Sequence, residues 1–189
     1  MNMYAGSLLN VKNLLGRRTL IVGDIGSGKT RLTARVLEEF VKMKLDDYIT
    51  VIDMAPEPVG NIGGKLCIYT TATSRVKYLA PEIVYTPRLS GKSKDEIITL
   101  AVRNAMNIKS CILEYLQAPS PILILNDLSM YLHAGDLVDI IECIEVANTF
   151  VGNGYYGTFF SEDYGSGISV RERVLMECLM RFMDFVYRL

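Results

Sequence analysis

The sequence predicts an α/β fold in which helices cover both faces of a mainly parallel sheet. Short apolar stretches with the composition of strands alternate with longer stretches of helical periodicity along most of the 189 residues. This alternation is typical of strand-helix-strand units joined by right-handed crossovers. Residues 122–125 are uniformly apolar, as expected for a central parallel strand that is buried on both faces.

Five segments are predicted to be strands, because each is short and rich in apolar, β-branched or aromatic residues. They are residues 19–22, 48–52, 122–125, 155–160 and 185–189. The fourth is punctuated by Gly157 and comes directly after Gly152-Asn153-Gly154, so it is expected to begin only after them.

Apolar residues recur at helical spacing in four further segments, which are predicted to be helices. They are residues 28–44, 93–117, 136–149 and a last helix that begins at Ser169. Ser93 and Ser169 are each followed three residues later by glutamate, the capping-box pattern of a helix start. In the last helix we expect five apolar residues to face inward: Val170, Val174, Leu175, Cys178 and Phe182.

Residues 54–92 have the least regular pattern, because prolines and glycines interrupt them repeatedly. Residues 66–70 and 83–85 are the parts most similar to strands, and they would pair as a hairpin. An insertion of this length forms either a lid or partner surface, or a part of the core. At this chain length we expect one domain, residues 1–189, that includes this insertion.

The segment after the first strand has the sequence pattern of a phosphate-binding loop. It reads G-D-I-G-S-G-K-T from Gly23 to Thr30 and leads into a helix. Glycines allow several backbone N–H groups to converge on phosphate oxygens, and the helix start adds its positive dipole end. Lys29 would contact the β- and γ-phosphates, and the Thr30 hydroxyl would bind Mg²⁺. The predicted nucleotide-binding residues are Gly23, Asp24, Ile25, Gly26, Ser27, Gly28, Lys29, Thr30 and Arg31.

A second motif follows the uniformly apolar strand, where Asn126 and Asp127 stand at its carboxyl end. An aspartate in this position is typical of the Walker B pattern, in which the carboxylate helps to bind Mg²⁺. Asp127 is therefore predicted to be a metal ligand together with Thr30. The alternative is an aspartate that only ends a buried strand at a turn.

With these two motifs the chain resembles the P-loop NTPases, over most of its length by element order and through the two motifs by sequence. The two strands after Asp127 resemble the additional-strand division, which includes the RecA-like and motor ATPases. The resemblance implies a three-layer fold with a mainly parallel five-stranded sheet in the order 5-1-4-3-2, and ATP and Mg²⁺ as ligands. It also implies that Ser161 is a polar sensor beside the γ-phosphate, although a serine in a strand-end turn is the alternative.

The sequence departs from this family at Leu128, where many of these ATPases have a glutamate that polarises the attacking water. RecA-like members carry their glutamate at the end of the strand after the first helix, and Asp53 stands at the comparable position. Asp53 is therefore the predicted catalytic acid, with Glu57 and Glu162 as alternatives. Lys29 and Ser161 complete the predicted catalytic set.

Composition argues against several other classes of protein. The net charge of −1 does not indicate a nucleic-acid partner, and the four widely spaced cysteines fit neither a disulfide framework nor a zinc site. No apolar stretch has transmembrane length, so we expect a cytoplasmic protein that does not bind membranes. The absence of N-K-x-D weighs against an ordinary GTPase. His133, the only histidine, is expected to be a partly exposed turn residue.

Three functions are consistent with the sequence. The first is a slow or partner-stimulated ATPase that couples nucleotide state to assembly or conformational change. A homo-oligomer or protein partner could then supply an arginine, for which Arg171, Arg173 and Arg181 are candidates. The second is a small nucleotide-dependent phosphotransferase or other transferase, with residues 54–92 as its acceptor lid. The third is a nucleotide-binding regulatory module with little turnover.

Overall fold

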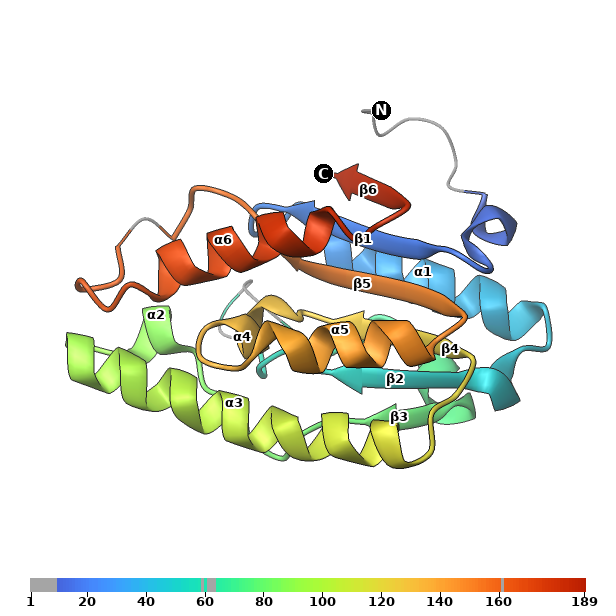
Figure 1. The fold of residues 1–189 in the computed structure, drawn as a ribbon, viewed down its shortest axis with the longest axis horizontal. Coiled ribbons are helices and arrows are strands. Elements are labelled where there is room, and N and C mark those ends of the chain that lie inside the picture. Colours follow the sequence, from blue (N-terminus) through green and yellow to red (C-terminus); the bar gives the residue numbers. More distant parts are fainter. Residues whose placement is uncertain (1–9, 59, 61–63, 161) are drawn as a thin grey trace.

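Six strands form the centre of the computed structural model, which describes residues 10–58, 60, 64–160 and 162–189. The strands are β1 (Arg18–Gly23), β2 (Ile49–Asp53), β3 (Lys77–Leu79), β4 (Ile122–Asn126), β5 (Thr149–Tyr155) and β6 (Phe185–Arg188). They lie in the order β3-β2-β4-β5-β1-β6, and each pair of neighbours is parallel (Figure 1). The predicted α/β class with a parallel sheet is confirmed.

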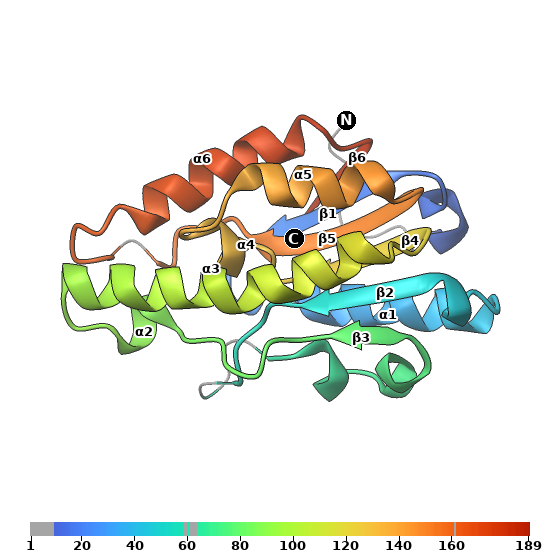
Figure 2. The ribbon, with the colours of Figure 1, turned by 60° about the horizontal axis from the view of Figure 1, so that its bottom comes forward.

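Helices pack on both faces of this sheet (Figure 2). The α-helices are α1 (Lys29–Lys42), α2 (Pro87–Ser90), α3 (Lys94–Gln117), α4 (Ser129–Leu132), α5 (Leu137–Val146) and α6 (Ile168–Met180). Four 3-10 helices span Val11–Leu14, Asp46–Tyr48, Leu66–Ile68 and Thr71–Arg75. The predicted helix start at Ser93 is confirmed, because its hydroxyl accepts a hydrogen bond from the Glu96 N–H.

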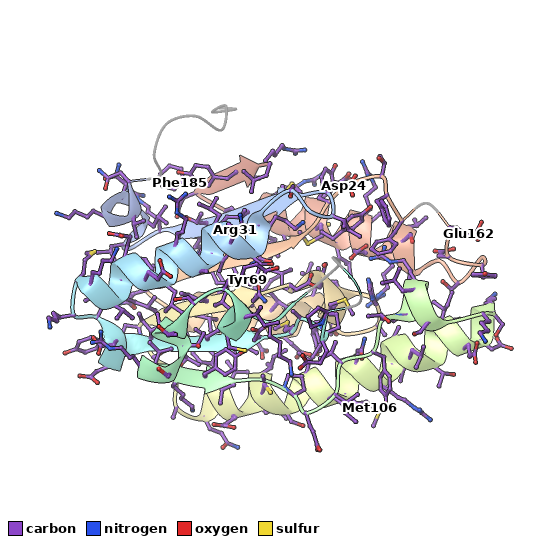
Figure 3. The ribbon with its side chains drawn as sticks, turned by 180° about the vertical axis from the view of Figure 1, so that it is seen from behind. Asp24, Arg31, Tyr69, Met106, Glu162 and Phe185 are labelled. Carbon is purple, nitrogen blue, oxygen red and sulfur yellow. The ribbon has the colours of Figure 1, made fainter. Side chains whose placement is uncertain are left out.

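The strands bury alternate residues in two separate cores. Leu20 and Val22 of β1 pack with residues of α3, α4, α5 and α6, whereas Ile21 packs with α1 and the 3-10 helices of the opposite face. Successive side chains of a strand point to opposite faces, so strands apolar at both sets of positions require cover on both sides. Figure 3 looks onto the α1 face, where Arg31 of α1 lies near Tyr69.

The sheet has one strand more than the five predicted. The additional strand, β3, pairs with the outer side of β2. It comes from the irregular segment 54–92, but not from either part that resembled a strand. Residues 66–68 form a 3-10 helix, and residues 83–85 lie outside helices and strands. The predicted hairpin was wrong, because prolines and short polar caps such as Thr70 favour isolated turns in this segment.

The fourth predicted strand was misplaced by about one strand length. Residues 155–160 were expected, but β5 spans Thr149–Tyr155 and includes both glycines of the G-N-G sequence. Close packing explains a glycine inside the strand. A Cβ atom at Gly152 would lie 2.6 Å from a ring carbon of Phe150 and 2.8 Å from a methyl carbon of Leu128. The glycine pattern that suggested a break therefore marks a close approach between β5 and its neighbours.

The predicted start of the last helix was also wrong, and its predicted buried face was right only in part, because Leu175 is half-buried against the core. Helix α6 begins at Ile168 after Gly167, and Ser169 lies inside it rather than at its cap. Val170, Val174 and Phe182 are exposed, and the buried face instead consists of Ile168, Glu172, Met176 and Leu179. Because Glu172 is one of the four, the apolar residues alone do not show the helical spacing of this face.

Candidate functional site

The phosphate-loop sequence forms a tight turn between β1 and α1. Gly26 and Gly28 have φ values of 71° and 94°, which glycine adopts without the strain of other residues. A Cβ atom at Gly23 would lie 2.7 Å from the Ser27 hydroxyl oxygen, so the turn closes tightly on itself. The Lys29 ammonium donates to the main-chain oxygen of Asp24 across the turn, at 2.7 Å. Burial lowers the pKa of Lys29, while the nearby Asp127 and Asp24 carboxylates act in the opposite direction.

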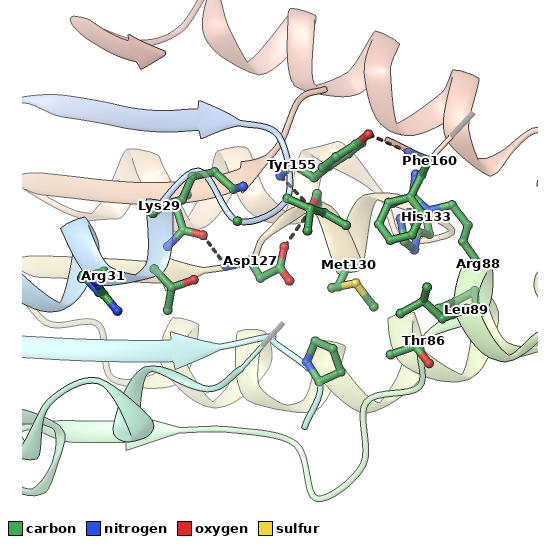
Figure 4. A pocket seen from close by; sticks show the side chains of 18 of the residues that line it. Lys29, Arg31, Thr86, Arg88, Leu89, Asp127, Met130, His133, Tyr155 and Phe160 are labelled. Atoms are coloured by element: carbon green, nitrogen blue, oxygen red, sulfur yellow. Dashed lines mark hydrogen bonds between the residues drawn. The ribbon is translucent and has the colours of Figure 1, made fainter. Parts of the chain in front are cut away.

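A cavity of about 350 Å³ lies at the carboxyl ends of the strands. Figure 4 shows Arg31 at one end, Arg88, His133 and Phe160 at the other, and Asp127 between them. Six of the nine predicted nucleotide-binding residues line this cavity: Ile25, Gly26, Gly28, Lys29, Thr30 and Arg31. The structure therefore brings the phosphate loop and Asp127 to one cavity.

The other three predicted nucleotide-binding residues, Gly23, Asp24 and Ser27, do not line the cavity. The Asp24 carboxylate instead accepts hydrogen bonds from the backbone N–H groups of Ile25 and Thr158, at 2.8 and 3.0 Å. The Thr158 N–H is the main reason that the pKa of Asp24 lies below its ordinary value. Asp24 therefore fastens the loop between β5 and α6 to the phosphate loop.

Asp127 has an unusual backbone conformation that two contacts to β5 support. Its φ is 55°, in the left-handed region that aspartate tolerates better than most residues. Its N–H donates to the side-chain oxygen of Asn153 at 3.0 Å, and the next N–H, of Leu128, donates to the Asn153 main-chain oxygen at 2.9 Å. One carboxylate oxygen accepts the Ser129 hydroxyl at 3.0 Å. Burial raises the pKa of Asp127, and the Ser129 hydrogen bond and the Lys29 charge partly oppose this.

A row of buried polar side chains joins the ends of β2, β4 and β5 to α1. Asn153 donates to Asn126 at 2.7 Å and to the Thr33 hydroxyl at 2.8 Å. Asn126 in turn donates to Asp53 at 2.7 Å. All four of these side chains are buried, so each hydrogen bond also removes the free-energy cost of an unpaired group. These hydrogen bonds hold together the carboxyl ends of the strands, including the end of β4 that Asp127 follows.

Asp53, the predicted catalytic acid, is part of that row and does not line the cavity. Besides Asn126, its two oxygens accept hydrogen bonds from Ala55 N–H, Leu66 N–H and the Tyr78 hydroxyl. Burial raises the pKa of Asp53, and the Asn126 and Tyr78 hydrogen bonds act in the opposite direction. Its carboxylate is thus occupied by four donors that hold the segment after β2.

The alternative acids and two of the three candidate arginines also have other partners. Glu57 pairs with Lys65 at 2.7 Å, and Glu162 accepts the Tyr164 N–H. Arg171 donates to the main-chain oxygens of Leu132 and Gly135, and Arg173 donates to that of Gly157. Arg181 is exposed. Ser161, the predicted sensor, lies outside the described residues.

Arg88 and His133 line the far end of the cavity and both contact Glu172, an arrangement that the sequence did not predict. The Arg88 guanidinium contacts both oxygens of Glu172, at 2.6 and 3.2 Å, and His133 Nε2 lies 3.1 Å from Glu172 Oε1. All three side chains are at least nine-tenths buried. The expectation of a partly exposed His133 was therefore wrong. We call Arg88, His133 and Glu172 the buried ionic cluster.

Aromatic rings enclose the arginine of this cluster. The Arg88 guanidinium carbon lies 4.3 Å from the Phe160 ring centre and 5.1 Å from that of Tyr155, within the range of cation–π attraction. The helical spacing of Ile168, Glu172, Met176 and Leu179 could have revealed the acid, because a glutamate among apolar residues of one helix face needs a buried partner. No sequence pattern pointed to Arg88, which comes from the irregular segment.

Glu172 makes the stability of the protein dependent on pH. Burial by itself raises the pKa of Glu172, but contacts with His133 and Arg88 outweigh it, so the pKa lies below its ordinary value of 4.5. A carboxyl group whose pKa is lowered by folding stabilises the folded state at pH values above its ordinary pKa. This stabilisation is lost as the pH falls through the lowered pKa of the folded state. We therefore expect the loss of unfolding free energy in Glu172→Gln to shrink as the pH is lowered through 4.5.

Urea unfolding of the wild type and of this variant at a series of pH values measures the effect. Glu177→Gln, an exposed change on the same helix, is the matched control and should show a small difference that varies little with pH. A Glu172→Gln deficit that grows on acidification would contradict the expected sign.

The chain is thus an α/β protein whose cavity at the strand ends combines a glycine-rich turn, a lysine, an aspartate and a buried ionic cluster. No protein-family model matches it, and no curated protein matches it in sequence. In the described ranges, no three His, Cys, Asp or Glu side chains gather as a protein-held metal ion would require. None of the described helices has both the length and the apolar character of a membrane span.

Proposed function

We propose that the chain binds ATP with Mg²⁺ in this cavity and acts as a slow or partner-stimulated ATPase of the P-loop class. The observation that carries the proposal is the joint lining of the cavity by Lys29, Thr30 and Asp127. Asp127 is far from Lys29 and Thr30 in sequence, and a phosphate-loop lysine and hydroxyl would need a strand-end carboxylate beside them to bind a metal-bound triphosphate. Nucleotide state would then drive assembly or a conformational change.

The strand order supports the same class. Without the edge strand β3, the strands lie in the order β6-β1-β5-β4-β2. Renumbered along the chain from one to five, this order reads 5-1-4-3-2. In it β5 lies between β1, which leads into the phosphate loop, and β4, which leads into Asp127. This is the order implied by the resemblance to the additional-strand division of P-loop NTPases. In open parallel sheets, ligands bind beyond the carboxyl ends of the strands, where the cavity lies.

The residues present also fit a magnesium ion. Mg²⁺ is usually held by one or two protein groups together with phosphate oxygens and water, so it does not need a cluster of several acids. Thr30 and Asp127 would hold it, since both line the cavity and only one Asp127 oxygen accepts the Ser129 hydroxyl. When bound, the ion would neutralise charge on the β- and γ-phosphates.

Slow turnover follows from the groups beside Asp127. The Leu128 side chain is fully buried in the apolar core, so it provides neither an acid nor a proton acceptor. Asp53 is engaged with four donors outside the cavity. The phosphate loop and metal residues can position and stabilise the reacting phosphates, but activation of water would depend on another group or on a partner.

A transferase remains the second candidate because the cavity continues past Asp127. Thr86, Pro87, Arg88 and Leu89, from the end of the irregular segment, line its far part. That space would suit a small acceptor molecule beyond the γ-phosphate. Phosphate release that requires an added nucleoside or other small acceptor would favour this function over an ATPase.

Isothermal titration with ATP, with and without Mg²⁺, tests the proposal. The wild type should bind ATP more tightly in Mg²⁺, and Asp127→Asn should lose about tenfold in affinity, or about 1.4 kcal/mol, in the presence of Mg²⁺ only. Glu142→Gln, an exposed change on α5, is the control and should bind as the wild type does. A wild-type protein that binds no nucleoside triphosphate would refute the proposal.

A further inference from the structure

His133 is the one histidine of the chain, and its two ring nitrogens have very different surroundings. Nε2 lies 3.1 Å from a carboxylate oxygen of Glu172. Nδ1 is buried and has no hydrogen-bond partner among the described residues. A buried nitrogen without a partner costs free energy, so its presence beside a cavity calls for an explanation.

The contact with Glu172 defines which nitrogen carries the proton. Glu172 also accepts two hydrogen bonds from the Arg88 guanidinium, which keeps the carboxylate ionised. An ionised carboxylate only accepts hydrogen bonds, so Nε2 must donate. In the neutral ring Nδ1 then has a free lone pair and is a proton acceptor.

The imidazole of His133 belongs to the wall of the cavity. His133 directly follows α4, the short helix that begins two residues after Asp127, and it lines the cavity together with Lys29 and Asp127. In Figure 4 it lies on the side of Asp127 that faces away from Arg31. In phosphate-loop sites the lysine reaches the β- and γ-phosphates, so the γ-phosphate would lie near Lys29 and Asp127, in the cavity that His133 also lines.

The other described residues of the cavity wall offer no comparable base. Carboxylate and imidazole groups in the described lining come from Asp127 and His133 alone. Asp127 is the metal residue of the proposed function, and the lysine and arginines of the wall are donors. Since position 128 is a leucine, the site lacks the usual acid that activates water, and the His133 imidazole is a group that can accept a proton in its place.

We propose that His133 is the proton acceptor for the attacking water, and that Glu172 is the positioning residue that holds Nδ1 unprotonated. This inference rests on the proposed ATPase function. The water oxygen forms a bond to the γ-phosphorus as the bond from that phosphorus to the β–γ bridging oxygen breaks. The bridging oxygen leaves with the electron pair as part of ADP, and the water proton moves to Nδ1 and later to solvent.

The single histidine permits a direct test by nuclear magnetic resonance with ¹⁵N-labelled histidine. In the free wild-type protein, the spectrum should show a protonated Nε2 and an unprotonated Nδ1. Adding MgADP with aluminium fluoride, which imitates the transferring phosphoryl group, should shift the Nδ1 resonance more than that of Nε2. In Glu172→Gln the proportion of the other tautomer should rise, whereas Glu177→Gln should leave the spectrum unchanged.

Kinetics of one conservative variant complete the test. In His133→Gln the amide can still donate to Glu172, but the Nδ1 acceptor is lost. We expect kcat for ATP hydrolysis to fall about 100-fold, as for loss of a general base. Affinity for MgATP should stay within about twofold, because the residue does not hold the bound nucleotide.

The outcomes separate this inference from the proposed function. Unchanged kcat in His133→Gln, a protonated Nδ1, or an Nδ1 resonance that ignores a nucleotide analogue which demonstrably binds would each overturn the role of His133. All three results leave ATP binding intact and so spare the proposed function. Failure of the wild type to bind any nucleotide would instead reject both.

Discussion

Replacing Lys29 with alanine is expected to weaken MgATP binding by about 100-fold or more. The ammonium group lies in the phosphate loop beside the cavity, and charge-assisted contacts to two phosphates together contribute about 3 kcal/mol. Within the chain the same group makes a hydrogen bond to the main-chain oxygen of Asp24. Burial lowers its pKa, so removing it also removes a desolvation cost, and the free energy of unfolding should change little.

Titration calorimetry and urea unfolding of the same preparation separate these two effects. Lys42→Ala removes an exposed lysine from the other end of α1, where it pairs with Glu39, and it is the matched control. It should bind MgATP as the wild type does. If Lys29→Ala retained wild-type affinity, the phosphate loop would not be the nucleotide site.

Replacing Arg88 with methionine is expected to lower the free energy of unfolding by about 3–5 kcal/mol, because the change leaves the buried Glu172 carboxylate without its guanidinium counter-charge. The side chains of this pair are only 5% and 2% exposed, so water cannot take the place of the guanidinium. Urea unfolding near neutral pH measures the loss. Since α2 and α6 meet through this pair, the effect should be on the whole fold.

A double variant distinguishes the lost charge pair from lost packing. Adding Glu172→Gln to Arg88→Met removes the uncompensated charge while the amide oxygen can still accept from His133, so about half or more of the lost stability should return. Arg75→Met breaks an exposed pair with Asp46 and should have a far smaller effect. A double variant as unstable as the single one would show that Arg88 acts through its packing on Phe160 and Tyr155.

The parts of the molecule that the sequence predicted best depend on local chemistry. The predicted phosphate loop forms a turn between β1 and α1 because positive-φ glycines and a following amphipathic helix are encoded in adjacent residues. The start of α3 at Ser93 likewise depends on a side chain three residues from its acceptor. The uniformly apolar sequence of β4 correctly indicated a strand buried on both faces. Asp127 follows this strand at its carboxyl end, as expected, and lines the cavity.

The parts that were missed depend on contacts between distant residues. Gly152 fits inside β5 because Phe150 and Leu128 fill the space where its side chain would be, and no local pattern reveals this. The acidic residue on the buried face of α6 is paired with an arginine 84 positions earlier. Asp53 stands at a strand end that suggested catalysis, but the N–H of Leu66 and the Tyr78 hydroxyl reach it from a segment without regular periodicity.

Asn153 has a consequence for how the sequence could vary in evolution. Its amide uses both donors, toward Asn126 and Thr33, and its oxygen accepts the Asp127 N–H. Aspartate would lack the donors, and leucine would remove the partner of the Asn126 side-chain oxygen and of the Asp127 N–H, while Thr33 would keep only its hydrogen bond to the Lys29 main-chain oxygen. Position 153 therefore tolerates few replacements unless Asn126 and Thr33 change with it. In descendants of a common ancestor that keep this site, these positions should vary together, and their joint pattern would identify relatives more specifically than the phosphate loop alone.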